Sequence, residues 1–158
     1  MTTPVELADD LVRERDAFLE ELGRADHGSS MGRDLVGEWG ARELIAHLGY
    51  WAGHAAEGIH IADQGGAAER EPEELDVDEI NATVARIARG TDLATVQRRE
   101  LASVEALLDR VRVMNPSLLA ESMPEGDTLE AAVREDGPVH YREHADELRR
   151  VREGVGGG

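Results

Sequence analysis

The chain of 158 residues carries 34 acidic against 17 basic residues, and this net charge of -17 excludes direct binding to nucleic-acid phosphates. It contains neither cysteine nor lysine, which excludes disulfides, thiolate metal sites, a cysteine nucleophile and a P-loop. No apolar stretch approaches the roughly 20 residues of a membrane span, and the acidic N-terminus lacks a signal-peptide pattern, so we expect a cytoplasmic protein without membrane contact.

The first predicted helix spans residues 4–24, where inward positions recur at spacings of three and four. These positions are Val5, Ala8, Leu11, Val12, Arg15, Phe18, Leu19 and Leu22. Gly23 is predicted to end the helix, because glycine is frequent just beyond helix C-termini. The polar run 26–30 predicts a turn, in which we expect His27 to be solvated.

The second predicted helix runs from about residue 41 to residue 63, with Gly40 as a tolerable N-cap and Glu43 in the first turn. One side of this helix is apolar and consists of Leu44, Leu48, Ala52, Ala55 and Ile59. A second stripe beside it consists of His47, Trp51, His54 and Gly58. The two histidines and the tryptophan of that stripe therefore point roughly the same way. His60 lies about 140° from this face and is expected to be solvated.

Residues 66–77 are acidic with little to bury, and we expect a mobile loop there. A short helix is predicted over 78–89, followed by Thr91 as the cap of a long helix over 92–113 that ends before Asn115-Pro116. The inward positions of the long helix are Leu93, Val96, Glu100, Val104, Leu107, Leu108 and Val111.

The capping box Asp127-Thr128-Leu129-Glu130 predicts another short helix, which Asp136-Gly137-Pro138 then breaks or kinks. A final helix over 139–153 precedes a glycine-rich tail, 154–158, that we expect to be frayed. Four long helices with short extra pieces favour an all-α, antiparallel four-helix bundle, formed as a single domain by residues 1–153.

Two histidines of the final helix, His140 and His144, are four residues apart and therefore share one face. Leu148 and Val151 continue their stripe, which predicts that the histidines face the bundle interior. In a bundle, a third ligand must come from a facing helix, and His47 is the strongest candidate. Three neutral imidazoles can bind one divalent ion and leave positions for water, as in catalytic rather than structural metal sites.

Several other residues have two interpretations each. His54 either belongs to a pocket, as part of its wall or as a proton shuttle, or is a hydrogen-bonded histidine of the core. Trp51 either contacts a substrate or is part of the core. Tyr141 borders a cleft or packs at a helix boundary, whereas Glu143 is expected to face solvent. A carboxylate such as Glu100 could act as a fourth metal ligand, which would favour a closed, structural site.

Two segments, Trp39–Leu48 and His140–His144, resemble the start of the second helix and the closing motif of the DinB/YfiT-like superfamily. The segment Asp78–Asn81 is similar to the actinobacterial branch related to mycothiol-dependent maleylpyruvate isomerases. The resemblance implies a four-helix bundle, often dimeric, in which a triad of His47, His140 and His144 binds zinc or nickel. The sequence departs from the family pattern at two points. Gly40 stands where Ser or Thr is the usual helix cap, and the separate C-terminal domain of the isomerases is missing. The second departure leaves the isomerase substrate unsupported for this chain.

These observations lead to three functional hypotheses. The first is a metal-dependent enzyme that transfers a low-molecular-weight thiol such as mycothiol to a small electrophilic substrate, with the metal lowering the pKa of the thiol. The second is a hydrolase in which metal-bound water attacks. The third is a non-catalytic, stress-associated bundle that binds a metal or ligand. For each of them we expect a small-molecule partner and a homodimer.

Overall fold

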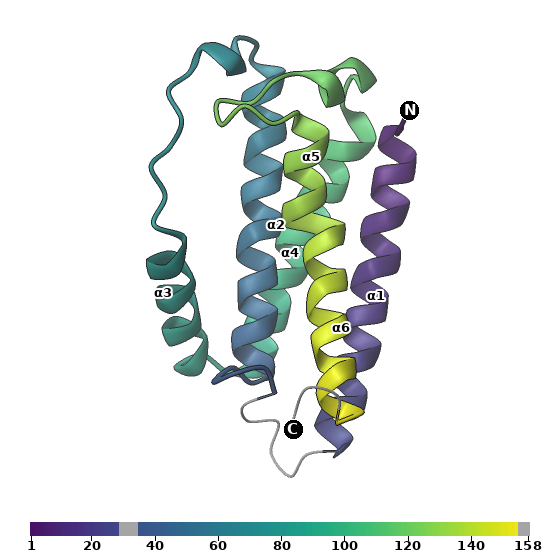
Figure 1. The fold of residues 1–158 in the computed structure, drawn as a ribbon, viewed down its shortest axis with the longest axis vertical. Coiled ribbons are helices and arrows are strands. Elements are labelled where there is room, and N and C mark those ends of the chain that lie inside the picture. Colours follow the sequence, from purple (N-terminus) through teal and green to yellow (C-terminus); the bar gives the residue numbers. More distant parts are fainter. Residues whose placement is uncertain (29–34, 155–158) are drawn as a thin grey trace.

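The computed structural model describes residues 1–28 and 35–154, and its helices pack side by side as a bundle (Figure 1). The helices are α1 (Pro4–Gly28), α2 (Ala41–Asp63), α3 (Val77–Arg89), α4 (Leu93–Val113), α5 (Leu129–Arg134) and α6 (His140–Arg152). The described residues contain no strand, only two isolated β-bridges. The prediction of an all-α helical bundle is therefore confirmed. Among these residues, no helix is both long and apolar enough to cross a membrane.

Side-chain caps determine where several helices begin. Asp76, Asp92 and Thr128 each accept a hydrogen bond from the backbone N–H three residues later, which satisfies a donor that a helix start otherwise leaves free. The prediction that Thr91 caps α4 is wrong. Its hydroxyl instead donates to the carbonyl of Ile87 in the preceding helix, and the aspartate one residue later takes the capping position.

The connection between α2 and α4 decides the topology. It descends along one side of the bundle and includes α3, so that α4 starts at the same end as α2 and runs parallel to it (Figure 1). The final helix likewise runs parallel to α1, against which it packs. The remaining neighbours, α1 with α4 and α2 with the α5–α6 helix, are antiparallel. A long crossover of this kind is one of the standard ways to connect four helices.

The parallel pair α2 and α4 approaches closely at Gly49. A Cβ atom added there would lie 3.0 Å from the Cα atom of Glu100, so a larger residue would force the helices apart. Leucine and alanine side chains fill the rest of the interface and much of the core. The predicted apolar stripe of α2 is entirely buried.

The last long helix is kinked where the sequence predicts it. A π-helical segment, η3 (Glu135–Val139), joins α5 to α6, and Gly137 within it departs from helical backbone angles. Pro138 lacks a backbone N–H and therefore cannot donate the usual helical hydrogen bond. Such π-bulges often accompany functional sites, because they change which residues face a neighbouring helix.

The structure corrects three details of the sequence analysis. Helix α1 continues through Gly23 to Gly28, since one glycine costs only about 1 kcal/mol in a helix whose neighbouring residues pack against the core. Val5 and Val12 are exposed, whereas Leu7 is buried. Val151 is 58% exposed, so the apolar continuation of the histidine stripe ends one turn earlier than predicted.

Two loop regions complete the chain. The connection after α2 forms a 3₁₀ turn, Ala67–Glu69, and has no further regular structure before α3; its predicted mobility stays a prediction. A second 3₁₀ turn, Pro116–Ala120, follows α4. The side chain of His27, the predicted turn at residues 29 and 30, and the tail beyond residue 154 lie outside the described residues.

Candidate metal centre

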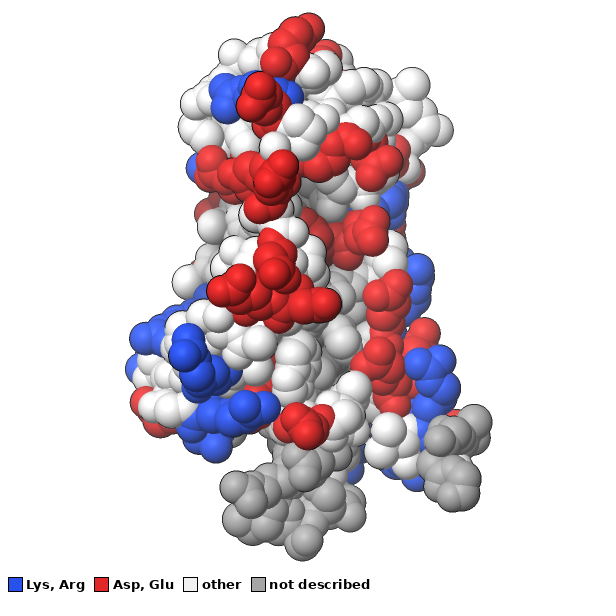
Figure 2. Space-filling view, turned by 60° about the vertical axis from the view of Figure 1, so that its left-hand side comes forward, with Lys and Arg blue, Asp and Glu red and all other residues white. Residues whose placement is uncertain are grey.

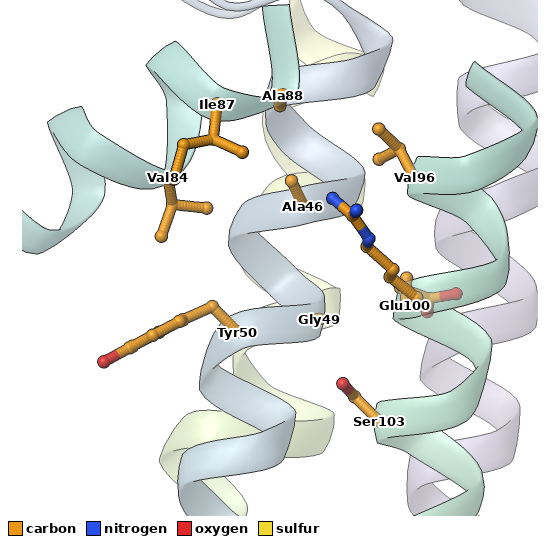
Figure 3. A pocket seen from close by; sticks show the side chains of 10 residues that line it. Ala46, Gly49, Tyr50, Val84, Ile87, Ala88, Val96, Glu100 and Ser103 are labelled. Atoms are coloured by element: carbon orange, nitrogen blue, oxygen red, sulfur yellow. The ribbon is translucent and has the colours of Figure 1, made fainter. Parts of the chain in front are cut away.

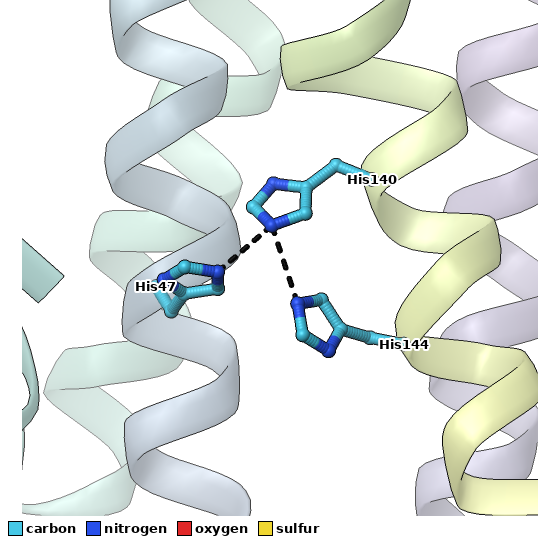
Figure 4. Close-up of side chains that lie close together, drawn as sticks. All are labelled: His47, His140 and His144. Atoms are coloured by element: carbon cyan, nitrogen blue, oxygen red, sulfur yellow. Dashed lines mark hydrogen bonds between the residues drawn. The ribbon is translucent and has the colours of Figure 1, made fainter. Parts of the chain in front are cut away.

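Three histidines from two helices converge on one point of the bundle (Figure 4). Helix α2 supplies His47, and the first turns of α6 supply His140 and His144. The Nε2 atom of His140 lies 2.8 Å from Nε2 of His47 and 3.2 Å from Nε2 of His144. In all, three potential ligand atoms lie within 4.8 Å of one another. The predicted triad is therefore brought together in space.

Hydrogen bonding alone does not satisfy these rings. A neutral imidazole has one N–H and one lone pair, so Nε2 of His140 can form only one well-aligned hydrogen bond, although two nitrogens approach it. The Nδ1 atoms of His47 and His140 are also buried, without a hydrogen-bond partner among the described residues. A cation bound to the Nε2 atoms would leave these Nδ1 atoms unpaired, so it is the convergence of the Nε2 atoms that indicates a metal.

A divalent cation fits this arrangement. Two nitrogens bound to zinc at about 2.0–2.1 Å with tetrahedral angles lie about 3.3 Å apart. The Nε2 atoms of His140 and His144 are 3.2 Å apart, and those of His47 and His140 are somewhat closer at 2.8 Å. A cation would use all three Nε2 lone pairs at once. In the described part of the chain, no further histidine or carboxylate joins the group, so the protein would supply three ligands.

Burial keeps two of these histidines neutral at pH 7. Desolvation, together with the other histidines of the triad, lowers the pKa of His47 to about 4 and that of His140 to about 3. Interaction with the Asn81 side chain opposes the shift at His47 without cancelling it. Only 6% of His47 is exposed, and the ring of Trp39 packs on it with 4.8 Å between centroids. Neutral imidazole is the form that binds metals.

The third histidine is oriented by a carboxylate. Nδ1 of His144 lies 2.9 Å from Oε2 of Glu147, one turn further along α6. This contact favours the tautomer that donates from Nδ1 and leaves the Nε2 lone pair free. Metal-binding histidines commonly use such a second hydrogen bond to a carboxylate, which orients the ring and raises its basicity.

The triad borders an open cleft of about 550 Å³ between α2, α3, the connection before α3 and the α5–α6 helix. His47 and His140 form part of its wall. Six carboxylates also line it, with no arginine among the lining residues: Glu73, Glu125, Asp127, Glu135, Asp136 and Glu143. Figure 2 shows acidic side chains along the upper and middle parts of this face, whereas basic ones gather lower down at the left.

The other residues that the sequence analysis singled out on α2 lie in the same cleft. Trp51 is mostly buried, and its indole N–H donates to the Asn81 side chain at 2.9 Å. His54 packs edge-on against Trp51 and is only partly buried, so it is a cleft residue rather than a core histidine. Its Nδ1 atom lies 2.7 Å from Oδ2 of Asp136 in the π-helical segment.

Tyr141 lies away from the cleft, in the core. It is fully buried and donates to Oε1 of Glu100 at 2.6 Å, while Arg15 donates to both oxygens of the same carboxylate at 2.7 and 2.8 Å. Burial and the adjacent carboxylate raise the pKa of Tyr141 well above its usual value, so its hydroxyl remains a donor. With both oxygens engaged in this way, Glu100 is not a fourth ligand for the triad.

A second, smaller cavity of about 220 Å³ lies between α2, α3 and α4 (Figure 3). Its walls are mainly apolar, with Val84 and Ile87 on one side and Val96 on the other. It contains no group of potential metal ligands. The chemistry of the protein is therefore concentrated in the larger, acidic cleft.

The sequence analysis does not identify the two residues that hydrogen-bond His54 and Trp51 as site residues. Asp136 appears there only in a helix-breaking tripeptide, and Asn81 only in a family-like segment. The spacing of four residues between Asp136 and His140 would have been a signal, because it places both on a similar side of the helix. The sequence contains no comparable signal for Asn81.

Comparisons with protein-family models, with curated proteins and with solved structures found no match. The resemblance to the DinB/YfiT-like superfamily therefore stays a prediction. The structure itself supports a helical bundle with a histidine triad.

Proposed function

We propose that this protein binds a divalent metal, zinc or nickel, through His47, His140 and His144 and is a metal-dependent enzyme. The observation that carries the proposal is the convergence of three Nε2 atoms beside an open cleft. A site with three protein ligands retains coordination positions for a reactant, as catalytic zinc sites do. The engagement of Glu100 with Arg15 and Tyr141 argues against a closed structural site.

We further propose that the reaction transfers a low-molecular-weight thiol of the mycothiol type to a small electrophile. A divalent cation held by imidazoles lowers the pKa of a thiol and so supplies a nucleophile near neutral pH. The chain has no cysteine, so the thiol must come from a cosubstrate. The cleft volume of about 550 Å³ is within the usual range for small-molecule sites.

The lining of the cleft narrows the class of electrophile. Carboxylates from the connection before α3, from the loop before α5 and from the last long helix surround the cleft, and no arginine among the lining residues offsets them. An anionic substrate would meet repulsion in this region, whereas a neutral or cationic one would not. The proposed substrate is therefore a neutral or cationic electrophile. A dicarboxylate is disfavoured.

The test uses protein stripped of metal with a chelator and then reloaded with one equivalent of zinc or nickel. We expect the loaded protein to conjugate mycothiol to a neutral electrophile such as monochlorobimane, and the stripped protein not to. His47→Ala should lose metal and turnover together. The matched control, His60→Ala, changes a half-buried histidine of the same helix that does not line the cleft, and it should retain both.

The other outcomes separate the competing functions. Product formed from a hydrolysable substrate without any thiol would indicate the hydrolase. Stoichiometric metal without turnover of either kind would indicate a non-catalytic metal-binding bundle. If the purified protein binds neither metal with all three histidines present, the proposal is wrong.

A further inference from the structure

A histidine–aspartate pair lies in the same cleft as the triad. Nδ1 of His54 and Oδ2 of Asp136 are 2.7 Å apart, and both residues line the cleft. The carboxylate accepts from Nδ1–H, which directs the remaining ring nitrogen, Nε2, away from Asp136. That nitrogen has no hydrogen-bond partner among the described residues. A histidine oriented in this way can accept and return a proton.

The packing keeps this pair in one geometry. The ring of Trp51 contacts His54 edge-on with 5.1 Å between centroids, and Trp51 is itself held by its hydrogen bond to Asn81. Asp136 belongs to the π-helical segment, which is anchored by the buried Gly137 and Pro138. The pair therefore links α2 to the last long helix. The triad links the same two helices four to eight residues away along the chain.

The separation between the pair and the triad suits one small molecule. His54 is seven residues from His47 on α2, a rise of about 10 Å, and Asp136 is four residues from His140, a rise of about 6 Å. A ligand that extends over about 6–10 Å can therefore contact both His54 and the triad. Because a direct hydrogen bond spans only about 3 Å, a proton would pass between them through polar groups of that ligand or through bridging water molecules.

The surroundings of His54 are mostly anionic. His54 lines the cleft and also a smaller cavity of about 170 Å³ beside it. The charged groups lining these two cavities are Glu57, Arg70, Glu71, Glu73, Glu125, Asp127, Glu135, Asp136 and Glu143. The hydrogen bond that His54 donates to Asp136, and to a smaller extent the charges of Asp136, Glu73 and Glu125, raise the pKa of His54 against the opposing effect of burial.

We propose that His54 is the general acid–base residue of this cleft and that Asp136 is its positioning residue. The inference rests on the proposed thiol transfer and adds a residue role that the metal site does not supply.

The proposed step is balanced without any redox change. The proton of the thiol passes to Nε2 of His54, and sulfur forms a bond to the electrophilic carbon as the bond from that carbon to the leaving group breaks. The leaving group departs with its electron pair. His54 then gives its proton to the leaving group or, where that group is a weak base such as chloride, to water. The products are a thioether, the leaving group and one released proton, and His54 is again neutral.

The experiment measures kcat/KM against pH for metal-loaded wild-type protein and for the variants His54→Gln, Asp136→Asn and His60→Gln. We expect His54→Gln to lower the rate roughly 10²- to 10⁴-fold and to remove the acidic limb of the profile. Asp136→Asn should move that limb to lower pH, because the amide no longer favours the protonated histidine. The control His60→Gln, at a half-buried position of the same helix that does not line the cleft, should match wild type.

Metal content and melting temperature, measured on every variant, distinguish a catalytic from a structural role. All three variants should retain one equivalent of metal and a folded state. A His54→Gln protein with an unchanged rate and acidic limb would overturn the inference and leave the proposed function standing. A limb that stays in place in Asp136→Asn would exclude the positioning role. If wild type has no thiol-transfer activity, the proposed function fails, and the inference is overturned with it.

Discussion

Replacing His144 with alanine should remove most of the thermal stabilisation that a divalent metal gives to this protein. A ligand that binds only the folded state adds about 2.7 kcal/mol when its free concentration is 100 times its Kd. For a domain of this size, about 1 kcal/mol changes Tm by about 2–4 °C, so wild type should gain roughly 5–11 °C. With two imidazoles left, we expect Kd to rise at least about 100-fold, which reduces the gain to about 1 °C at the same metal concentration.

The assay compares Tm with and without zinc for each protein, so that any effect of the substitution on the metal-free fold cancels. This matters because the side chain of His144 is only 13% exposed and contributes to packing. Elemental analysis of the same samples gives the metal stoichiometry. His60→Ala serves as the control, since it removes a half-buried histidine of α2 that is not part of the triad and should keep the full shift.

Two results would refute the reasoning. If His144→Ala keeps the same metal-induced shift and the same stoichiometry as wild type, then His144 is not a ligand and its approach to His140 is only a packing contact. If wild type shows no shift with either zinc or nickel, then the converging nitrogens do not form a metal site.

Three further predictions follow from the same contacts. Glu147→Gln, which weakens the carboxylate contact to Nδ1 of His144, should reduce metal affinity about 10- to 100-fold in a chelator competition, and an unchanged affinity would contradict the orienting role. Burial lowers the pKa of His47 in the folded protein below its value in the unfolded chain. At a pH between these two pKa values, His47 therefore takes up a proton when the protein unfolds. The free energy of unfolding of the metal-free protein should consequently fall by about 2 kcal/mol through this residue between pH 7 and pH 5. Urea unfolding at both pH values checks this, and His47→Gln should show a shallower dependence. Tyr141→Phe should cost about 1.5–3 kcal/mol of stability through its lost hydrogen bond to Glu100 and leave metal affinity unchanged; a loss of metal affinity would place Tyr141 in the site.

The sequence alone was sufficient for the helices and for part of the site. The apolar stripe of α2 depends on local periodicity, which neighbouring residues determine. The predicted capping box correctly places a helix start near residue 128, but the cap is Thr128 and not the aspartate before it. Periodicity also placed His140 and His144 on one face of a helix and identified His47 as their partner. His54 shares the stripe of His47 but lies about 10 Å further along the helix.

Only the tertiary structure shows which side chains from different helices face one another. Whether Tyr141 borders the cleft or joins the core depends on the rotation of α6 against α1 and α4, which brings its hydroxyl to Glu100. The pairing of His54 with Asp136 depends on the register of two antiparallel helices and on the π-helical segment between α5 and α6. The parallel course of α2 and α4 follows from the long connection between them, which includes α3 and returns the chain to the end of the bundle where α2 begins. Such relations join residues far apart in the chain, so they are fixed by packing and not by local sequence.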